Sequence, residues 1–246
     1  MTAHRIALLL VPGLACDGSV WQPQRDHFSK YPDIDVHVAD LGLSASTRAM
    51  AQALWDRYPG RLAVAGFSLG GYVAQEMAQL APERLLGLAL LSTQAGTDPP
   101  AMAAVRAGWI DQARREGTDA MAHAFLPKFA TARYLEQAGH SEALQAMIRR
   151  HPLDAFCAEQ LAIQTRSDRS RAVAALECPT LALIPTQDAL VAPANQHQMA
   201  ASCAVKRIEE VAGSGHSVML EAPQAVNSAL QGWLDSIRAR QLTAPL

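Results

Sequence analysis

Three side chains that together could supply a nucleophile, a base and an orienting acid lie far apart in the 246-residue sequence. Ser68 stands in Gly66-Phe67-Ser68-Leu69-Gly70, between a β-prone run and a helix-period run, so the chain must turn sharply there. Asp188 and His216 each follow a later apolar run of strand length. An imidazole can take the proton of an attacking serine hydroxyl, and a carboxylate can fix the imidazole tautomer. The pattern predicts Ser68 as nucleophile, His216 as base and acid, and Asp188 as the orienting group.

Each of these residues also has a simpler interpretation. A glycine-rich turn with a solvated serine is common, Asp188 could cap a helix or close a turn, and His216 could be an ordinary loop histidine. A second carboxylate, Asp98, follows the fourth expected strand and could orient the histidine instead. The order serine, acid, histidine, each just beyond an expected strand, favours the catalytic interpretation, because parallel sheets bind ligands beyond the carboxyl ends of their strands.

A serine that attacks a carbonyl also needs hydrogen-bond donors for the negative charge that develops on oxygen. The backbone N–H of Leu69 follows Ser68 at the expected start of a helix. Gly13 follows the first expected strand, where glycine allows close backbone approach, and Leu14 then offers a second N–H. We therefore expect an oxyanion hole formed by the N–H groups of Leu14 and Leu69.

Short apolar runs alternate with helix-period runs over most of the chain. The apolar runs predict strands at 5–11, 33–39, 62–65, 85–91, 179–184 and 205–211. This alternation is typical of an α/β fold with a mostly parallel sheet, here of about six strands. Between the fourth and the fifth of these strands the only segments are helix-period ones, at 100–116, 118–129, 131–150 and 153–167. We interpret residues 97–175 as an all-helical cap inserted into a core domain of residues 1–96 and 176–246.

Composition limits the partners and the compartment. Half of the residues are hydrophobic and the net charge is −2, without a long run of one sign, so neither a nucleic-acid groove nor a membrane-binding surface is expected. No apolar run approaches the ~20 residues that cross a bilayer. The four cysteines are scattered without metal-ligand spacing, which favours reduced thiols in the cytoplasm. The alternative is a short leader that ends at Cys16, but Pro12-Gly13 interrupts its apolar run.

Several motifs, spread over nearly the whole chain outside the cap, resemble the α/β-hydrolase superfamily. They are Val11-Pro12-Gly13-Leu14 with Trp21, Gly66-Phe67-Ser68-Leu69-Gly70-Gly71, Ala81-Pro82-Glu83-Arg84, Cys178-Pro179-Thr180 with Asp188, and Gly215-His216 with Glu221-Ala222-Pro223. The chain is similar in particular to small capped bacterial hydrolases, which include esterases, enol-lactonases and the pimeloyl-ester carboxylesterase. It departs from them at Pro12, where histidine is frequent. Met1 also stands too close to the first strand for the usual N-terminal hairpin, so we expect six parallel strands with the second strand in sequence at an edge.

The resemblance implies a serine hydrolase that acts on a small molecule and needs no metal or organic cofactor. We expect it to cleave a small carboxylic ester or lactone through an acyl-enzyme on Ser68. A thioesterase, or a hydrolase that cleaves C–C bonds of ring-cleavage dienoates, would use the same three residues. The alternative from a different class is a ligand-binding receptor that keeps these residues but turns over slowly.

A cap over the strand ends would exclude water and shape an apolar pocket. The expected lining residues from the core are Leu14, Phe67, Val191 and Val218, and those from the cap are Trp109, Phe125, Leu126 and Phe129. For the aromatic residues of the cap, packing against the sheet is the favoured interpretation. The oligomeric state is not predicted.

Overall fold

A single parallel sheet organises the molecule. The computed structural model describes residues 5–204 and 206–243, so Val205, where the last strand was expected to begin, lies outside the described residues. The strands are β1 (Ile6–Val11), β2 (Ile34–Val38), β3 (Leu62–Phe67), β4 (Leu85–Leu91), β5 (Thr180–Pro185) and β6 (Lys206–Val211). They follow the order β2-β1-β3-β4-β5-β6, and each neighbouring pair is parallel. The predicted fold class, with six strands and the second strand at an edge, is confirmed.

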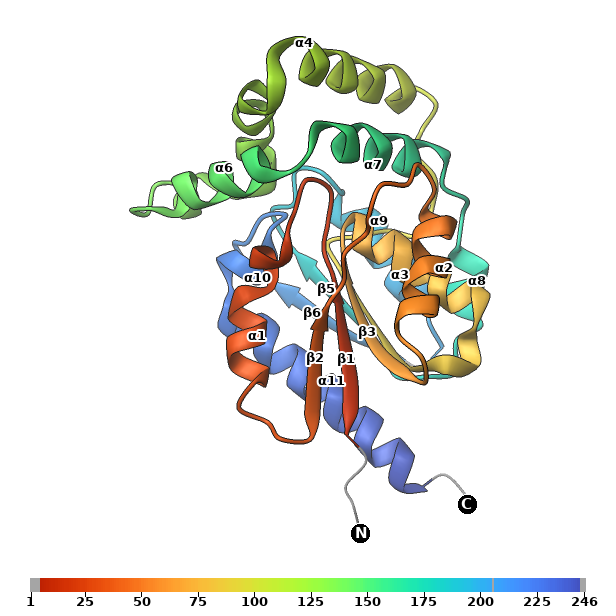
Figure 1. The fold of residues 1–246 in the computed structure, drawn as a ribbon. Helices are drawn as coiled ribbons and strands as arrows, with labels where there is room; N and C mark the ends of the chain where they lie inside the picture. The colour runs from red at the N-terminus through yellow and green to blue at the C-terminus, as the bar shows by residue number, and fades with distance from the viewer. Residues whose placement is uncertain (1–4, 205, 244–246) are drawn as a thin grey trace.

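The central strands are apolar throughout because helices cover both faces of the sheet. All residues of β3, β4 and β5 are buried, whereas most of β6 at the edge is exposed. On one face lie α1 (Gln22–Phe28) and α11 (Pro223–Thr243), as Figure 1 shows. On the other face lie α2 (Thr47–Arg57), α3 (Leu69–Leu80) and α9 (Pro193–Ser202). Short helical turns complete the core at η1 (Gly18–Trp21), η2 (Pro82–Arg84) and α10 (Val218–Glu221).

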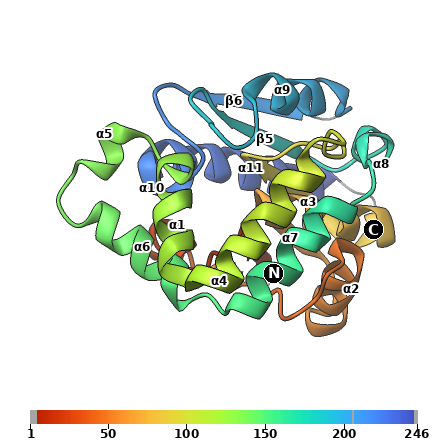
Figure 2. The same cartoon turned by 90° about the horizontal axis from the view of Figure 1, so that it is seen from above.

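Between β4 and β5 the described chain is helical and contains no strand. We refer to residues 97–175 as the insertion. Its helices are α4 (Met102–Phe129), α5 (Ala132–Leu135), α6 (His140–Arg150), α7 (Leu153–Thr165) and α8 (Ser170–Ala174). In Figure 1, α4, α6 and α7 lie above the carboxyl ends of the strands, and Figure 2 shows α4 beside α7. The short α8 instead packs beside α3 and α9 of the core.

Two glycines in the left-handed region divide the helical segments of the insertion. Gly117, with φ 78°, interrupts the helical path of α4 between the two helices expected at 100–116 and 118–129. Gly139, with φ 83°, precedes α6. The prediction of a single helix at 131–150 is therefore wrong, because the structure has α5, a turn and α6 there. A residue without Cβ adopts these angles at no steric cost, so the chain can change direction at both glycines.

No helix within residues 5–204 and 206–243 combines the length and apolarity needed to cross a membrane. The four cysteines are free thiols, and three of them are buried.

Candidate active site

The turn between β3 and α3 holds Ser68 in a strained backbone conformation. Its φ of 53° and ψ of −114° lie outside the regions that most residues adopt. The flanking glycines allow the turn to pack tightly: a Cβ on Gly66 would lie 2.4 Å from the Gly70 carbonyl oxygen, and one on Gly70 would lie 2.2 Å from the Val11 carbonyl oxygen. The backbone of Ser68 is fixed by its N–H, which donates to the Leu91 carbonyl at 3.0 Å. The sharp strand-to-helix turn expected from the sequence is therefore present.

Ser68, His216 and Asp188 form one hydrogen-bonded chain. The Ser68 Oγ lies 2.9 Å from His216 Nε2, and His216 Nδ1 lies 2.9 Å from each carboxylate oxygen of Asp188. In the tautomer with its proton on Nδ1, the imidazole donates to Asp188 and accepts from the Ser68 hydroxyl. The side chains of His216 and Asp188 are 2% and 0% exposed, so this contact is shielded from water.

Asp188 owes its orientation to the loop that follows β5. Its Oδ1 accepts the backbone N–H of Leu190 at 2.8 Å and that of Val191 at 2.9 Å, as in an Asx turn. Its Oδ2 accepts from Nε2 of the buried Gln196 at 2.9 Å. These three hydrogen bonds fix the direction in which the Asp188 carboxylate faces His216.

The loop after β6 carries His216 and is tied to both the core and the insertion. In the core, the Ser92 hydroxyl donates to the His216 carbonyl at 2.8 Å. In the insertion, the Phe129 carbonyl at the end of α4 accepts the Ser217 N–H at 2.7 Å. Glu221 Oε2 in turn accepts the N–H of Thr131 at 3.1 Å and its hydroxyl at 2.7 Å. The position of the imidazole thus depends on the insertion as well as on the sheet.

Asp98, the competing acid, is engaged elsewhere. Its Oδ2 pairs with Arg106 Nε at 2.5 Å and its Oδ1 with Arg166 Nη1 at 2.7 Å. Burial alone would raise the pKa of Asp98, but the hydrogen bond from Arg106 and the charges of both guanidinium groups outweigh it and hold that pKa below its usual value. Since Asp188 makes the contact with His216, Asp98 is not needed to orient the imidazole.

The two backbone donors expected for an oxyanion hole are not used within the described chain. Neither the N–H of Leu14 nor that of Leu69 hydrogen-bonds to an acceptor of residues 5–204 and 206–243. A residue of the insertion fixes the loop at Leu14: the next N–H, that of Ala15, donates at 3.0 Å to the buried carboxylate of Glu159 on α7. Glu159 was not foreseen from the sequence, where it is one of many helical acids.

Ser68 and His216 open into a cavity of about 240 Å³ between the sheet and the insertion. Of the residues expected there, Leu14, Phe67, Trp109, Phe125, Phe129 and Val191 line it. Two of the expected residues do not line it. Leu126 packs against the hydrophobic core, and Val218 is wholly buried at the start of α10, where the helix turns its side chain inward. The ring of Phe125 also packs edge-on against Trp109, Phe129 and Phe156, so the aromatic residues of α4 both line the cavity and pack together.

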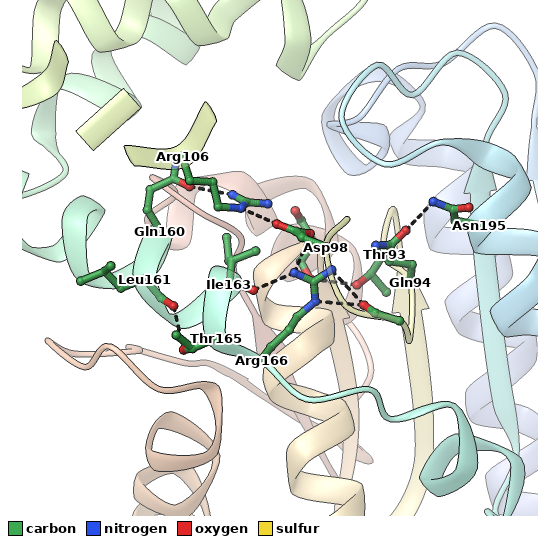
Figure 3. Close-up of polar contacts among 12 residues, drawn as sticks. Thr93, Gln94, Asp98, Arg106, Gln160, Leu161, Ile163, Thr165, Arg166 and Asn195 are labelled. Carbon is green, nitrogen blue, oxygen red and sulfur yellow. Dashed lines mark hydrogen bonds and ion pairs between the residues drawn. The ribbon is translucent and has the colours of Figure 1, made fainter. Parts of the chain in front are cut away.

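The cavity also has polar lining residues: Asp98, which the sequence analysis named only as a competing acid, and Gln94, Arg106 and Asn195, which it did not single out. Asn195 donates to the Gln94 side chain at 2.7 Å, so these two form one polar pair (Figure 3). Arg106 belongs to the ion pair with Asp98. The sequence signal for this residue was an arginine, Arg106, within the apolar stretch around Trp109. Its partner Asp98 lies in a loop before the helix, so the helical pattern could not predict the pair.

The sequence model of the alpha/beta hydrolase family matches residues 8–229. The chain belongs to the alpha/beta hydrolase family. The biotin biosynthesis bifunctional protein BioHC of Cellvibrio japonicus is 28% identical, and the alignment covers 95% of this chain and 48% of that protein. The chain therefore spans about half the length of this relative.

Two further relatives match this alpha/beta hydrolase over nearly their whole length. The pimeloyl-[acyl-carrier protein] methyl ester esterase of Xanthomonas oryzae pv. oryzae is 27% identical, and the alignment covers 95% of this chain and 97% of that enzyme. A thermophilic esterase of Thermogutta terrifontis, solved with malate bound, is 28% identical with a TM-score of 0.86, covering 96% of this chain and 92% of that one. These relatives thus support the α/β-hydrolase fold of this chain and its place among hydrolases.

Proposed function

We propose that this alpha/beta hydrolase cleaves a small carboxylic ester or lactone through an acyl-enzyme on Ser68. The observation that carries the proposal is the hydrogen-bonded chain from the Ser68 hydroxyl through His216 to the buried Asp188, at the floor of a largely apolar cavity. A serine that is hydrogen-bonded to an oriented imidazole is the arrangement that acyl transfer requires. Two relatives whose names describe them as esterases support the choice of an ester bond.

The geometry assigns a role to each group. As the Ser68 oxygen attacks the substrate carbonyl, His216 Nε2 takes the hydroxyl proton, and Asp188 stabilises the imidazolium that forms. The free N–H groups of Leu14 and Leu69 donate hydrogen bonds to the developing oxyanion. His216 then protonates the leaving alcohol, and the acyl group stays on Ser68. A water molecule, deprotonated by His216, hydrolyses the acyl-enzyme and restores the serine.

The insertion acts as the cap of this site in our proposal. Its helices α4 and α7 lie above the strand ends (Figures 1 and 2). Three of its aromatic residues line the cavity. Excluding water strengthens the electrostatic interactions around the oxyanion and limits the size of the substrate. A cavity of about 240 Å³ is smaller than the several hundred cubic ångströms typical of drug-sized ligands, which favours a short acyl chain.

The decisive experiment compares short p-nitrophenyl esters, lactones and thioesters on the wild type and on Ser68→Ala. We expect ester or lactone turnover by the wild type that is lost in Ser68→Ala. Ser217→Ala is the matched control, because its buried hydroxyl has no hydrogen-bond partner in the described chain. A fluorophosphonate probe should label the wild type at Ser68 and leave Ser68→Ala unlabelled.

Other outcomes would redirect the proposal. Faster consumption of a dienoate diketone than of any ester would show a C–C bond hydrolase that uses the same three residues. Acylation limited to a single slow turnover, with tight retention of the ligand, would show a receptor instead of an enzyme. Labelling of a residue other than Ser68 by the probe would contradict the assignment of the nucleophile.

A further inference from the structure

One residue with a permanent positive charge lines the cavity within the described chain, and it lies on the insertion. Arg106 on α4 shares this cavity with Ser68 and His216. Its side chain is 10% exposed, so the guanidinium is largely withdrawn from water. A buried arginine is costly unless its charge and its donors are used.

Part of the guanidinium is used by neighbouring side chains, as Figure 3 shows. Arg106 Nε donates to Asp98 Oδ2 at 2.5 Å, and Nη1 donates to the Gln160 Oε1 at 2.6 Å. The remaining N–H groups, two on Nη2 and one on Nη1, have no acceptor among residues 5–204 and 206–243. In Figure 3 the terminal nitrogen that carries no dashed line points away from Gln160.

The charge of Arg106 is not fully neutralised by Asp98. The carboxylate of Asp98 is shared with Arg166, whose guanidinium also donates to the carbonyls of Gly96 and Ile163. Two guanidinium groups around one carboxylate leave the cluster with one net positive charge. Two other carboxylates lie near the site, and neither lines the cavity: Asp188 is buried behind His216, and Glu159 accepts the Ala15 N–H.

We propose that Arg106 binds a free carboxylate on the substrate, so that the preferred substrate is a short ester or lactone carrying a second, ionised carboxyl group. This inference rests on the proposed function and names the class of substrate. A carboxylate accepts a pair of parallel N–H groups from arginine, which matches the unused donors on the two terminal nitrogens. The same apolar walls that bury Arg106 strengthen its attraction for an anion.

The test compares anionic and neutral substrates of equal shape. The monomethyl esters of succinic, glutaric and adipic acids are each compared with the methyl ester in which a primary amide replaces the free carboxyl group. At the chain length that spans the cavity, we expect the wild type to prefer the acid over the amide by about 10- to 100-fold in kcat/KM. Equal rates for acid and amide at every length would overturn the inference while leaving the proposed function intact.

Variants assign the preference to Arg106. In Arg106→Gln the acid and the amide should be hydrolysed within about twofold of each other, mainly through a rise in KM for the acid. Arg106→Lys keeps the charge but loses the paired donors, and it should keep part of the preference. The matched control is Arg114→Gln, which removes the same charge from an exposed position of the same helix and should keep the wild-type preference. A preference that survives in Arg106→Gln would contradict the assignment.

A binding measurement tests the inference without turnover. In Ser68→Ala, titration calorimetry should show that glutarate binds and that glutaramide does not, and the added change Arg106→Gln should abolish glutarate binding. Equal binding of the acid and the diamide would overturn the inference even if every ester were hydrolysed. If Arg106→Gln does not fold, the comparison of acid with diamide in Ser68→Ala and the Arg106→Lys variant still decide.

Discussion

The core and the insertion hold their halves of the site in different ways. In the core, Ser68, Asp188 and His216 follow β3, β5 and β6, so the sheet brings them to one edge and short loops set their directions. The insertion is held against the loops of the core by polar contacts, among them those of Glu159 with Ala15, Thr131 with Glu221, and Phe129 with Ser217. The strand ends and short loops of the core therefore position the proposed catalytic residues, whereas side-chain contacts of the insertion set the shape and charge of the cavity. Substitutions in the core and in the insertion should therefore affect activity and stability differently.

The largest effect should come from Asp188→Asn in the core. The amide keeps the shape but favours the wrong imidazole tautomer, so kcat should fall by about 10⁴-fold. Ester hydrolysis and thermal unfolding would be measured together, because the fold should change little. The matched control is Asp40→Asn, since Asp40 also accepts the N–H of the second residue after it, that of Gly42, but lies away from Ser68. A kcat for Asp188→Asn within tenfold of wild type would argue against the role of this carboxylate.

Replacing a glycine by alanine should have opposite effects on the free energy of unfolding in the core and in the insertion. Gly70→Ala would place a Cβ 2.2 Å from the Val11 carbonyl oxygen, and it should lower the free energy of unfolding by about 3 kcal/mol or more. Gly108→Ala, in an exposed turn of α4 with nothing within 4 Å of the new Cβ, should instead raise it by about 0.5–1 kcal/mol. Urea unfolding of both variants checks the pair. Equal destabilisation would mean that the backbone packs as tightly in the insertion as in the core.

The ion pair of Asp98 should stabilise the fold in a pH-dependent way. Because the folded-state pKa of Asp98 is depressed, its stabilisation is present above the unfolded pKa of about 3.9 and is lost as the pH falls through the folded value. Asp98→Asn should therefore lower the free energy of unfolding by about 2 kcal/mol at pH 7 and by little at the lowest pH where the protein folds. Asp119→Asn is the control, because its pair with Arg149 is exposed. A loss independent of pH would exclude the ionised carboxylate as the cause.

The smallest effect should come from the contact between Thr131 and Glu221. Thr131→Val removes the hydroxyl that donates to Glu221 at 2.7 Å and keeps the backbone N–H. We expect a loss of about 1 kcal/mol in the free energy of unfolding and a fewfold fall in kcat, because the loop of His216 is held less firmly. The control is Thr165→Val, whose hydroxyl bonds to Leu161 within α7. An unchanged kcat would show that the contact stabilises the insertion without positioning the imidazole.

The sequence predicted the core better than the insertion, for physical reasons. Strands buried on both faces appear as continuous apolar runs, and a tight strand-to-helix turn needs glycines at fixed positions, so both leave local signals. The sequence also placed Ser68, Asp188 and His216 just beyond the ends of three strands, where the structure shows them in contact.

The contacts of the insertion leave no comparable signal. Arg106 and Gln160 are 54 residues apart, and Thr131 and Glu221 are 90 apart. Each looks like an ordinary polar residue of a helix or loop until a fold brings its partner close. Val218 was expected to line the pocket, but at the start of α10 its side chain is buried in the core. Long-range side-chain pairing, rather than local propensity, decides such cases.

The unusual angles at Ser68 carry a consequence for how the protein evolves. A residue other than glycine in such a conformation costs about 1–3 kcal/mol, which the surrounding packing must offset. With Ser68 as the nucleophile that we propose, selection for turnover and selection for stability oppose each other at this position. In a lineage released from the need to turn over substrate, replacement of this serine by glycine would relax the chain and would be among the first changes to spread.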